Sequence, residues 1–557
     1  MIRSCPYCGE RAAASKVVQF CGACGRALVA SGPMLAVQLT SVSKTFGGRA
    51  ILSDLSLEVP AGECLVVVGM SGSGKSVLLE HIVGFQRPDS GTVQIMGVDL
   101  NRPPSLQTLE EVRARLSLVF QGSALIDSLS VIENVMLPLL MRSVSRDVSH
   151  RQSFELLKAV GLSASDAELS PAQLSGGMQK RVGIARALIT QPAVVLYDEP
   201  TTGLDAASSS VISRLIRSVQ QRDPQMASIT ITHDYLSAGL IADRVLYLNP
   251  NSGQLEEVLG RDEIVEIRRR HGGKSVAAVQ ALRGQLETFF DNLQLQHRPP
   301  HSQCPPMPWW QAFAAVPTGL FTAIGSSALL ALRLGPPTDR AALLRRFDEI
   351  GIRSLPVAAA AGAFFGMMLA LQIGIGLSGS GILDPLPRIV GNAVVDKIGP
   401  LVVGLLLAGR VAASTCAEVG GKRLSRQFDA LRSMSISPER YWLTPIFWAS
   451  VISLPLLTIA LELVAFAGAY CVAVGRYHVK SSFFMAEILA DVTLFGFLFG
   501  MVRAAVFGGA IALVGYENGT QDMRSSDDVG RATTVAVVAA SLAVIVLDFV
   551  MLFVASF

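Results

Sequence analysis

The sequence predicts a multidomain protein with a small cysteine-rich ribbon, an α/β phosphate-loop domain and an all-α polytopic membrane domain. Three observations support this. Two closely spaced cysteine pairs stand near the N-terminus, a glycine-rich loop follows the apolar run 65–68, and the second half holds long apolar stretches with few charges. A chain of 557 residues has room for about three or four domains.

Composition narrows the class of function. The formal net charge is only +3, so nothing indicates a nucleic-acid-binding surface. Residues 1–10 contain two cysteines and charged side chains where a secretory signal would need an apolar run. We therefore expect the soluble first half to lie in the cytoplasm and the apolar second half in a membrane.

The first domain, residues 1–30, is predicted to be a zinc ribbon. Its ligands would be Cys5, Cys8, Cys21 and Cys24, which form two C-x₂-C pairs. Four thiolates suit tetrahedral Zn²⁺, and a piece this small would depend on the metal to fold. The same cysteines could form a disulfide pair or a redox site, but a reducing compartment favours the structural metal.

The phosphate loop has the pattern G-x-x-x-x-G-K-[ST] between a buried strand and a helix. Such a loop turns its backbone N–H groups around a phosphate, and the following helix directs its positive end at the anion. Lys75 would reach the β- and γ-phosphates, and Ser76 would bind Mg²⁺. The predicted ATP-binding residues of this loop are Gly69, Ser71, Gly72, Gly74, Lys75 and Ser76.

A second motif, 174–179, reads Leu-Ser-Gly-Gly-Met-Gln and precedes a helical pattern. With it, residues 35–260 resemble an ABC transporter ATPase, whose domain is an α/β nucleotide-binding fold. The resemblance implies that Ser175, Gly176 and Gly177 grip the γ-phosphate of ATP bound to the other subunit. Catalysis would then require a dimer.

The same resemblance assigns the remaining motifs. Phe46 would stack on adenine, and Gln121 would contact Mg²⁺ and face the membrane domain. Asp198 ends a buried apolar strand and would hold Mg²⁺ through water, and Glu199 would polarise the attacking water. Two further catalytic residues complete the set: Asp205, in the loop that couples the two sites, and His233, which would bond the γ-phosphate.

Residues 261–305 are charged and then proline-rich, which predicts a helical tail and a linker. The permease would occupy 306–557. Its first apolar segment, 305–332 with Trp309 and Trp310 near its start, is long enough to span a bilayer. A span there would move the arginine-rich loop 418–440 to the far side, so we expect an interfacial helix over about 306–347 instead.

Five transmembrane helices are predicted near 355–377, 398–417, 441–474, 492–516 and 532–557. The motifs at 401–413, 427–434, 503–508 and 530–534 make this half resemble the permease of the MCE-associated, Mla-type lipid-transport ABC family. That family's pattern has Glu-Ile-Asp-Ala-Leu where this chain has Gln427 to Leu431, so the first acid is missing. Asp429 remains available for coupling to the ATPase.

Charges at membrane depth are costly and usually have a use. Glu462 interrupts the third span, and we take it as the candidate for a transport pathway. Lys397 and Arg503 fit pairing or an interfacial position better.

The sequence therefore predicts a homodimeric half-transporter of the bacterial inner membrane, with ATP and Mg²⁺ in the ATPase and structural Zn²⁺ in the ribbon. The resemblance implies phospholipid as the cargo and an MCE-domain protein as the partner, with no role for nucleic acid. The alternative is an ABC exporter of small amphiphiles or drugs without an MCE partner. A non-transport ABC regulator would not need the spans.

Overall fold

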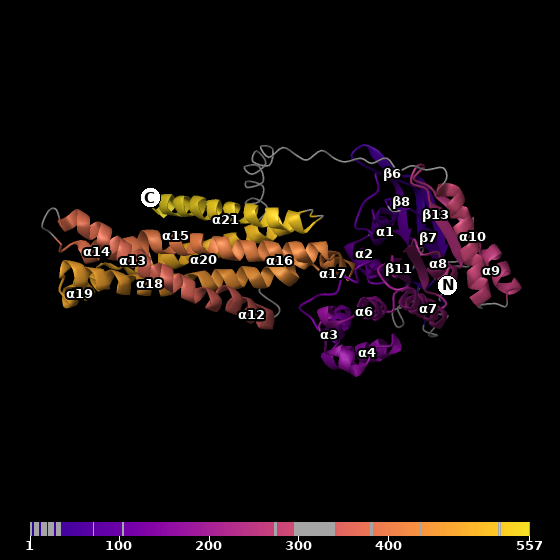
Figure 1. Cartoon of the computed structure of the whole chain (residues 1–557), viewed down its shortest axis with the longest axis horizontal. Coiled ribbons are helices and arrows are strands. Elements are labelled where there is room, and N and C mark those ends of the chain that lie inside the picture. The colour runs from indigo at the N-terminus through magenta and orange to yellow at the C-terminus, as the bar shows by residue number, and fades with distance from the viewer. Residues whose placement is uncertain are drawn as a thin grey trace. The chain divides into compact units, whose positions relative to one another are not determined.

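The computed structural model divides the chain into two compact units, which are described separately (Figure 1). Unit 1 comprises Met1–Ser302 and Asp429–Ile436, and unit 2 comprises Gln303–Phe428 and Ser437–Phe557. The structure describes residues 35–294 except 71, 103–104 and 272–275, residues 340–555 except 379–382, 435, 522 and 524, and four two-residue strands before residue 30. The predicted interfacial segment therefore falls outside the described residues up to position 339, with Trp309 and Trp310.

The first thirty residues contribute two short antiparallel hairpins. They are formed by β1 (Arg3–Ser4) with β2 (Arg11–Ala12) and by β3 (Gln19–Phe20) with β4 (Ala27–Leu28). One C-x₂-C pair lies in the sequence between the strands of each hairpin. The four cysteines themselves, Cys5, Cys8, Cys21 and Cys24, lie outside the described residues.

The rest of unit 1 is built on two sheets. A six-stranded sheet has the order β10-β11-β12-β7-β13-β14, parallel except for β14, and a four-stranded antiparallel sheet has the order β6-β5-β8-β9. The strands are β5 (Leu35–Phe46), β6 (Arg49–Pro60), β7 (Cys64–Val68), β8 (Ser90–Ile95), β9 (Val98–Asp99), β10 (Leu116–Val119), β11 (Val194–Asp198), β12 (Ala227–Thr232), β13 (Arg244–Leu248) and β14 (Leu255–Leu259). The helices are α1 (Lys75–Val83), α2 (Leu106–Arg113), α3 (Val131–Met141), α4 (Arg146–Ala159), α5 (Ala164–Ala167), η1 (Pro171–Gln173), α6 (Gly176–Leu188), α7 (Ala206–Arg222), α8 (Tyr235–Ile241), α9 (Arg261–Arg270) and α10 (Val276–Gln294).

Strand β7 is apolar throughout because both of its faces are buried. Leu65 and Val67 pack into a core shared with α1 and the four-stranded sheet. Cys64, Val66 and Val68 point the other way, into a core shared with α7, α8 and α10. The helices of the predicted tail thus contribute to the same core as the sheet, through residues such as Leu282 on α10.

Unit 2 is entirely helical within its described residues. Its elements are α12 (Arg340–Ile350), η2 (Ile352–Ser354), α13 (Leu355–Ser378), α14 (Leu386–Asn392), η3 (Ala393–Ile398), α15 (Gly399–Leu407), η4 (Ala408–Ala412), α16 (Ala413–Leu424), α17 (Gln427–Ser433, shared between the units), η5 (Glu439–Leu443), α18 (Thr444–Tyr477), α19 (Ser481–Asp491), α20 (Leu494–Gly519) and α21 (Ser526–Ala555). Among the residues that the structure describes, five helical stretches are long and apolar enough to cross a membrane: Arg340–Ser378, Leu386–Leu424, Glu439–Tyr477, Leu494–Gly519 and Ser526–Ala555. The five predicted transmembrane helices are confirmed as long apolar helices, whereas the interfacial position of the segment before them stays a prediction.

Small residues let α13 and α18 approach each other closely (Figure 1). A β-carbon at Gly362 would lie 2.5 Å from the carbonyl oxygen of Leu461, and one at Gly366 would overlap the carbonyl oxygen of Ala465. The backbones therefore contact each other at positions where only glycine fits, which is a common packing mode of membrane helices.

Candidate functional site

Four parallel strands end at one edge of the six-stranded sheet and deliver the predicted catalytic groups there. Gln121 follows β10, Asp198 ends β11, His233 follows β12, and the loop 69–74 follows β7. The pairings of Val119 with Tyr197, Asp198 with Ile231, and Thr232 with Val68 bring these ends level. Parallel sheets place ligands at the carboxyl ends of their strands, so this edge is the candidate site.

The phosphate loop adopts a conformation that needs its glycines. Gly72 and Gly74 have φ angles of 79° and 97°, which side-chain-bearing residues rarely adopt. Gly74 caps α1, whose first two residues are Lys75 and the half-buried Ser76. Ser71 lies outside the described residues.

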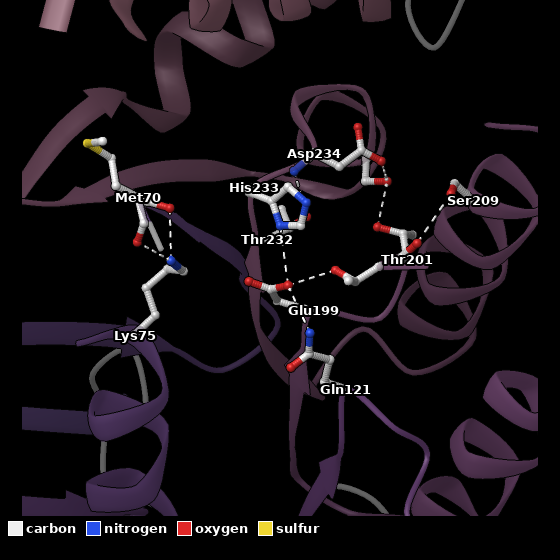
Figure 2. A network of polar contacts seen from close by, with 12 residues as sticks. Met70, Lys75, Gln121, Glu199, Thr201, Ser209, Thr232, His233 and Asp234 are labelled. Atoms are coloured by element: carbon white, nitrogen blue, oxygen red, sulfur yellow. Dashed lines mark hydrogen bonds and ion pairs between the residues drawn. The ribbon is translucent and has the colours of Figure 1, made fainter. Parts of the chain in front are cut away.

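Lys75 is buried and curls back onto its own loop (Figure 2). Its Nζ donates to the carbonyl oxygens of Gly69 at 2.8 Å and Met70 at 2.7 Å. Burial lowers the pKa of Lys75, while the charges of Glu199 and Asp198 oppose that shift. These carboxylates are therefore close enough for their charges to act on the lysine.

Glu199 is the centre of the polar network in Figure 2, with His233 and Gln121 on opposite sides. Its Oε2 accepts a hydrogen bond from Thr202 Oγ1 at 2.7 Å and a longer one from Gln121 Nε2 at 3.4 Å, and lies 3.2 Å from His233 Nδ1. The backbone of Glu199 has φ 46°, and its N–H donates to Ile231 O at 2.9 Å. A non-glycine residue in this sparsely populated region is typical of functional sites.

Lys180 and Thr202 belong to this network and were missed from sequence. Lys180, on α6, donates through Nζ to the carbonyl oxygen of Gln121 and at 3.4 Å to that of Glu199. Burial lowers the pKa of Lys180. Thr202 stands three residues after Glu199, a spacing that could have indicated a turn contact. The sequence around Lys180 has no pattern that indicates its contacts with the segments of Gln121 and Glu199.

Ser175, Gly176 and Gly177 lie at the N-terminus of α6. Ser175 is the N-cap residue, and its Oγ accepts from the N–H of Met178 at 3.3 Å. Ser175 and Gly176 are exposed. No contact joins them to the phosphate loop among the described residues, so within one chain this signature motif and Lys75 are not brought together.

Two further predicted residues lie at the margins of the site. Asp205 caps α7 and accepts from the N–H groups of Ala207 at 3.0 Å and Ser208 at 3.1 Å. Hydrogen bonds from Ser208 hold the pKa of Asp205 below its usual value. Phe46 ends β5 with 44% of its surface exposed, and Lys44 Nζ lies 5.5 Å from its ring centroid. Part of the Phe46 side chain is therefore accessible to solvent, as stacking on adenine would require.

The remaining candidates lie outside this sheet edge. Asp429 is half-buried on α17, in the segment that groups with unit 1, where the neighbouring Ala430 shares a small core with Phe120 and Ala124. Glu462 is 3% exposed on α18, and its Oε1 has no hydrogen-bond partner among the described residues. Neither residue belongs to the polar network around Glu199 described above.

Arg503 is fully buried in unit 2 and pairs with Asp548. Its Nε donates to Asp548 Oδ1 at 3.0 Å, and its Nη1 donates to the carbonyl oxygen of Asp396 at 2.6 Å. From sequence, pairing or an interfacial position is favoured for Arg503 over a role in a transport pathway, and the structure shows that it is paired.

In comparisons with known proteins, the two halves of the chain match different families. The family described as "ABC transporter" matches residues 52–202, and the family "Permease MlaE" matches residues 343–554. The chain is 35% identical over 242 residues to the glutamate transport ATP-binding protein GluA of Corynebacterium glutamicum, covering 40% of this chain and 98% of that protein. It is 40% identical over 213 residues to the methionine import ATP-binding protein MetN of Rhizobium johnstonii, covering 38% of this chain.

The alignment spans 58% of the length of that MetN relative, less than two thirds. Among solved structures, one titled "Dimeric Structure of MJ0796, a Bacterial ABC Transporter Cassette" is 32% identical. It covers 40% of this chain and 99% of its own, with a TM-score of 0.37.

Proposed function

The chain belongs to the family of ABC transporter ATP-binding proteins, and from this premise we propose that it is a homodimeric half-transporter that moves phospholipid at a bacterial inner membrane. The observation that carries the proposal is the presence, in one polypeptide, of a nucleotide site centred on Glu199 and of a segment matched by the family Permease MlaE. The partner on the far face would be an MCE-domain protein, as the Mla-type motifs imply.

In this mechanism, Lys75 and the N–H groups of residues 69–76 bind the phosphates of ATP. The oxygen donors Ser76, Asp198 and Gln121 fit Mg²⁺, which supplies charge neutralisation at the phosphates when bound. Glu199 orients the attacking water. Thr202 and His233 contact the carboxylate of Glu199 and hold it in place. Ser175 of the second copy would complete each site, because Lys75 and Ser175 of one chain are not in contact.

Asp429 and the segment around it would couple hydrolysis to transport. The support is that Asp429–Ile436 groups with the ATPase unit although it lies between two membrane helices in the sequence. Ala430 is 1% exposed there. When the ATPase units of the two copies close on each other, the movement would be transmitted through this segment to α16 and α18, which flank it in the sequence.

Glu462 would line the lipid pathway. A carboxyl at membrane depth with an unpartnered oxygen is costly unless it has a use. The N-terminal residues would form a zinc ribbon, which is supported by the cysteine spacing and by the two hairpins whose strands flank each pair.

The test is reconstitution of the full chain in liposomes with a fluorescent phospholipid. Wild-type protein should deliver the lipid to an acceptor MCE-domain protein only with ATP and Mg²⁺, and Glu199→Gln should bind ATP yet stop both hydrolysis and delivery. Vigorous hydrolysis by Glu199→Gln would refute the assignment of this residue. Transport of a small amphiphile without an acceptor, and no lipid movement, would favour the exporter.

A further inference from the structure

A cavity of about 290 Å³ lies in unit 1, apart from the nucleotide site. Its walls come from α2, β10, α3 and α6, and Ser433 and Met434, which group with the same unit, complete them. No predicted nucleotide-binding or catalytic residue lines it. Its volume is just below the range of typical ligand pockets, roughly 300–1,000 Å³, so it suits a small ligand.

The cavity concentrates positive charge. Arg113, Arg142 and Arg186 line it, and within the described parts of the chain no acidic side chain does. None of the three arginines forms an ion pair with a described carboxylate. By contrast, the exposed Arg146 on α4 does, with 3.5 Å between its Nη2 and Glu133 Oε1. The site therefore carries three guanidinium charges and no counter-charge from its own walls.

Arg186 makes this arrangement costly unless an anion binds. The side chain is only 5% exposed, and its Nη1 and Nη2 donate to the carbonyl oxygens of Ala124 and Ser123, each at 2.8 Å. Two neutral carbonyl groups satisfy part of its hydrogen-bonding capacity but leave its charge uncompensated. Burial lowers the pKa of Arg186 to about 10, so the guanidinium stays charged at neutral pH.

We propose that this cavity is a binding site for a small phosphate-bearing anion. Guanidinium groups bind phosphate oxygens with paired, charge-assisted hydrogen bonds, and three arginines line this cavity. Ser117 and Thr190 also line the cavity, and their hydroxyls are donors of the kind that phosphate oxygens accept. The phosphate group belongs to a free ester or to a lipid headgroup.

The site is connected to catalysis through the segment that carries Gln121. Ser123 and Ala124, whose carbonyls Arg186 holds, follow Gln121 by two and three residues and have φ angles of 62° and 44°. An anion that binds Arg186 would therefore change the hydrogen bonds of the turn at Ser123 and Ala124, which follows Gln121 of the nucleotide site. The inference goes beyond the proposed function and does not depend on lipid transport.

The test is calorimetric titration of the full chain, in phosphatidylcholine nanodiscs, with glycerol 3-phosphate. All proteins carry Lys75→Ala, which weakens phosphate binding at the nucleotide loop. We expect saturable binding that falls at least about tenfold when Arg113→Gln and Arg142→Gln are combined, since each removes a charge-assisted contact. The matched control Arg146→Gln should bind as tightly as the parent.

A second titration, with short-chain phosphatidic acid, distinguishes the two sources of phosphate. Tighter binding of the lipid than of glycerol 3-phosphate assigns the site to a headgroup, and the reverse order assigns it to a free ester. The proposal is overturned if neither probe binds, or if the Arg113 and Arg142 double variant binds both as tightly as the Arg146→Gln control. Equal melting temperatures of the variants would show that the comparison reports binding rather than folding.

Discussion

Glu199 gathers three side chains at a single carboxylate oxygen, so its position depends on its neighbours as much as on its own backbone. Thr202 makes the shortest of these contacts, 2.7 Å to Oε2, and Gln121 and His233 lie at 3.4 and 3.2 Å. Phosphoryl transfer relies on positioning and on charge stabilisation, so loss of a positioning contact should slow the chemical step.

Replacing Thr202 with Val tests this positioning role. The variant keeps the shape of the side chain but removes the hydrogen bond to Glu199, and kcat for ATP should fall about tenfold with KM unchanged. Steady-state ATPase kinetics measure both constants. Thr288→Val is the control, because that hydroxyl donates to Gly284 O within α10 and is not part of the network around Glu199. A wild-type kcat for Thr202→Val would contradict the role.

The motifs of the nucleotide site could be predicted from sequence because each occupies a few consecutive residues at the end of an apolar run. Gln121, Glu199 and His233 were identified in this way, and the structure brings them together. Lys180 could not be found, since its contacts with the carbonyls of Gln121 and Glu199 depend on how α6 crosses the sheet edge. Side chains that bond backbone groups leave no local pattern.

At the scale of elements, the contact between α13 and α18 depends on residues without side chains. Gly366→Ala should destabilise the protein by about 1–3 kcal/mol, because the added carbon overlaps the carbonyl oxygen of Ala465. Gly376→Ala, on the same helix, meets nothing within 4 Å and should leave stability equal or slightly higher. The melting temperatures of the purified proteins give the comparison. Equal shifts for both variants would show that the close approach does not matter.

The proposed N-terminal zinc ribbon leads to a prediction about bound metal. Purified protein should contain one zinc ion per chain by elemental mass spectrometry, and Cys21→Ser should lose it. Cys471→Ser is the control, because that thiol is exposed on α18, far from the ribbon in sequence. Zinc-free wild-type protein, or zinc retained by Cys21→Ser, would rule out the ribbon.

The membrane helices were predictable from length and apolar composition, but their internal breaks were not. The stretch Leu386–Leu424 contains two π-helical segments, Ala393–Ile398 and Ala408–Ala412. A π-helical turn contains an extra residue, and such a turn cannot be recognised from the hydropathy of the sequence. One carbonyl in the first segment, that of Asp396, accepts from Arg503, a contact between residues 107 positions apart.

At the scale of the whole molecule, each chain holds one phosphate loop and one signature motif, and among the described residues of these motifs no hydrogen bond joins the two. Two copies related by a two-fold axis would complete two sites at once, with Lys75 from one and Ser175 from the other. The two-unit division groups the short segment Asp429–Ile436 with the ATPase unit although apolar spans surround it in the sequence, and the family resemblance makes Asp429 of this segment the candidate for coupling to the ATPase. Hydropathy assigns residues to a membrane or to water but does not indicate which domain a connecting loop packs on.

The most direct test of this account is the ATPase rate of nanodiscs sorted by whether they hold one or two copies of the full chain. Discs with two copies should hydrolyse ATP, and discs with one copy should bind ATP without turnover. Hydrolysis in single-copy discs at the rate per chain of the two-copy discs would contradict the account.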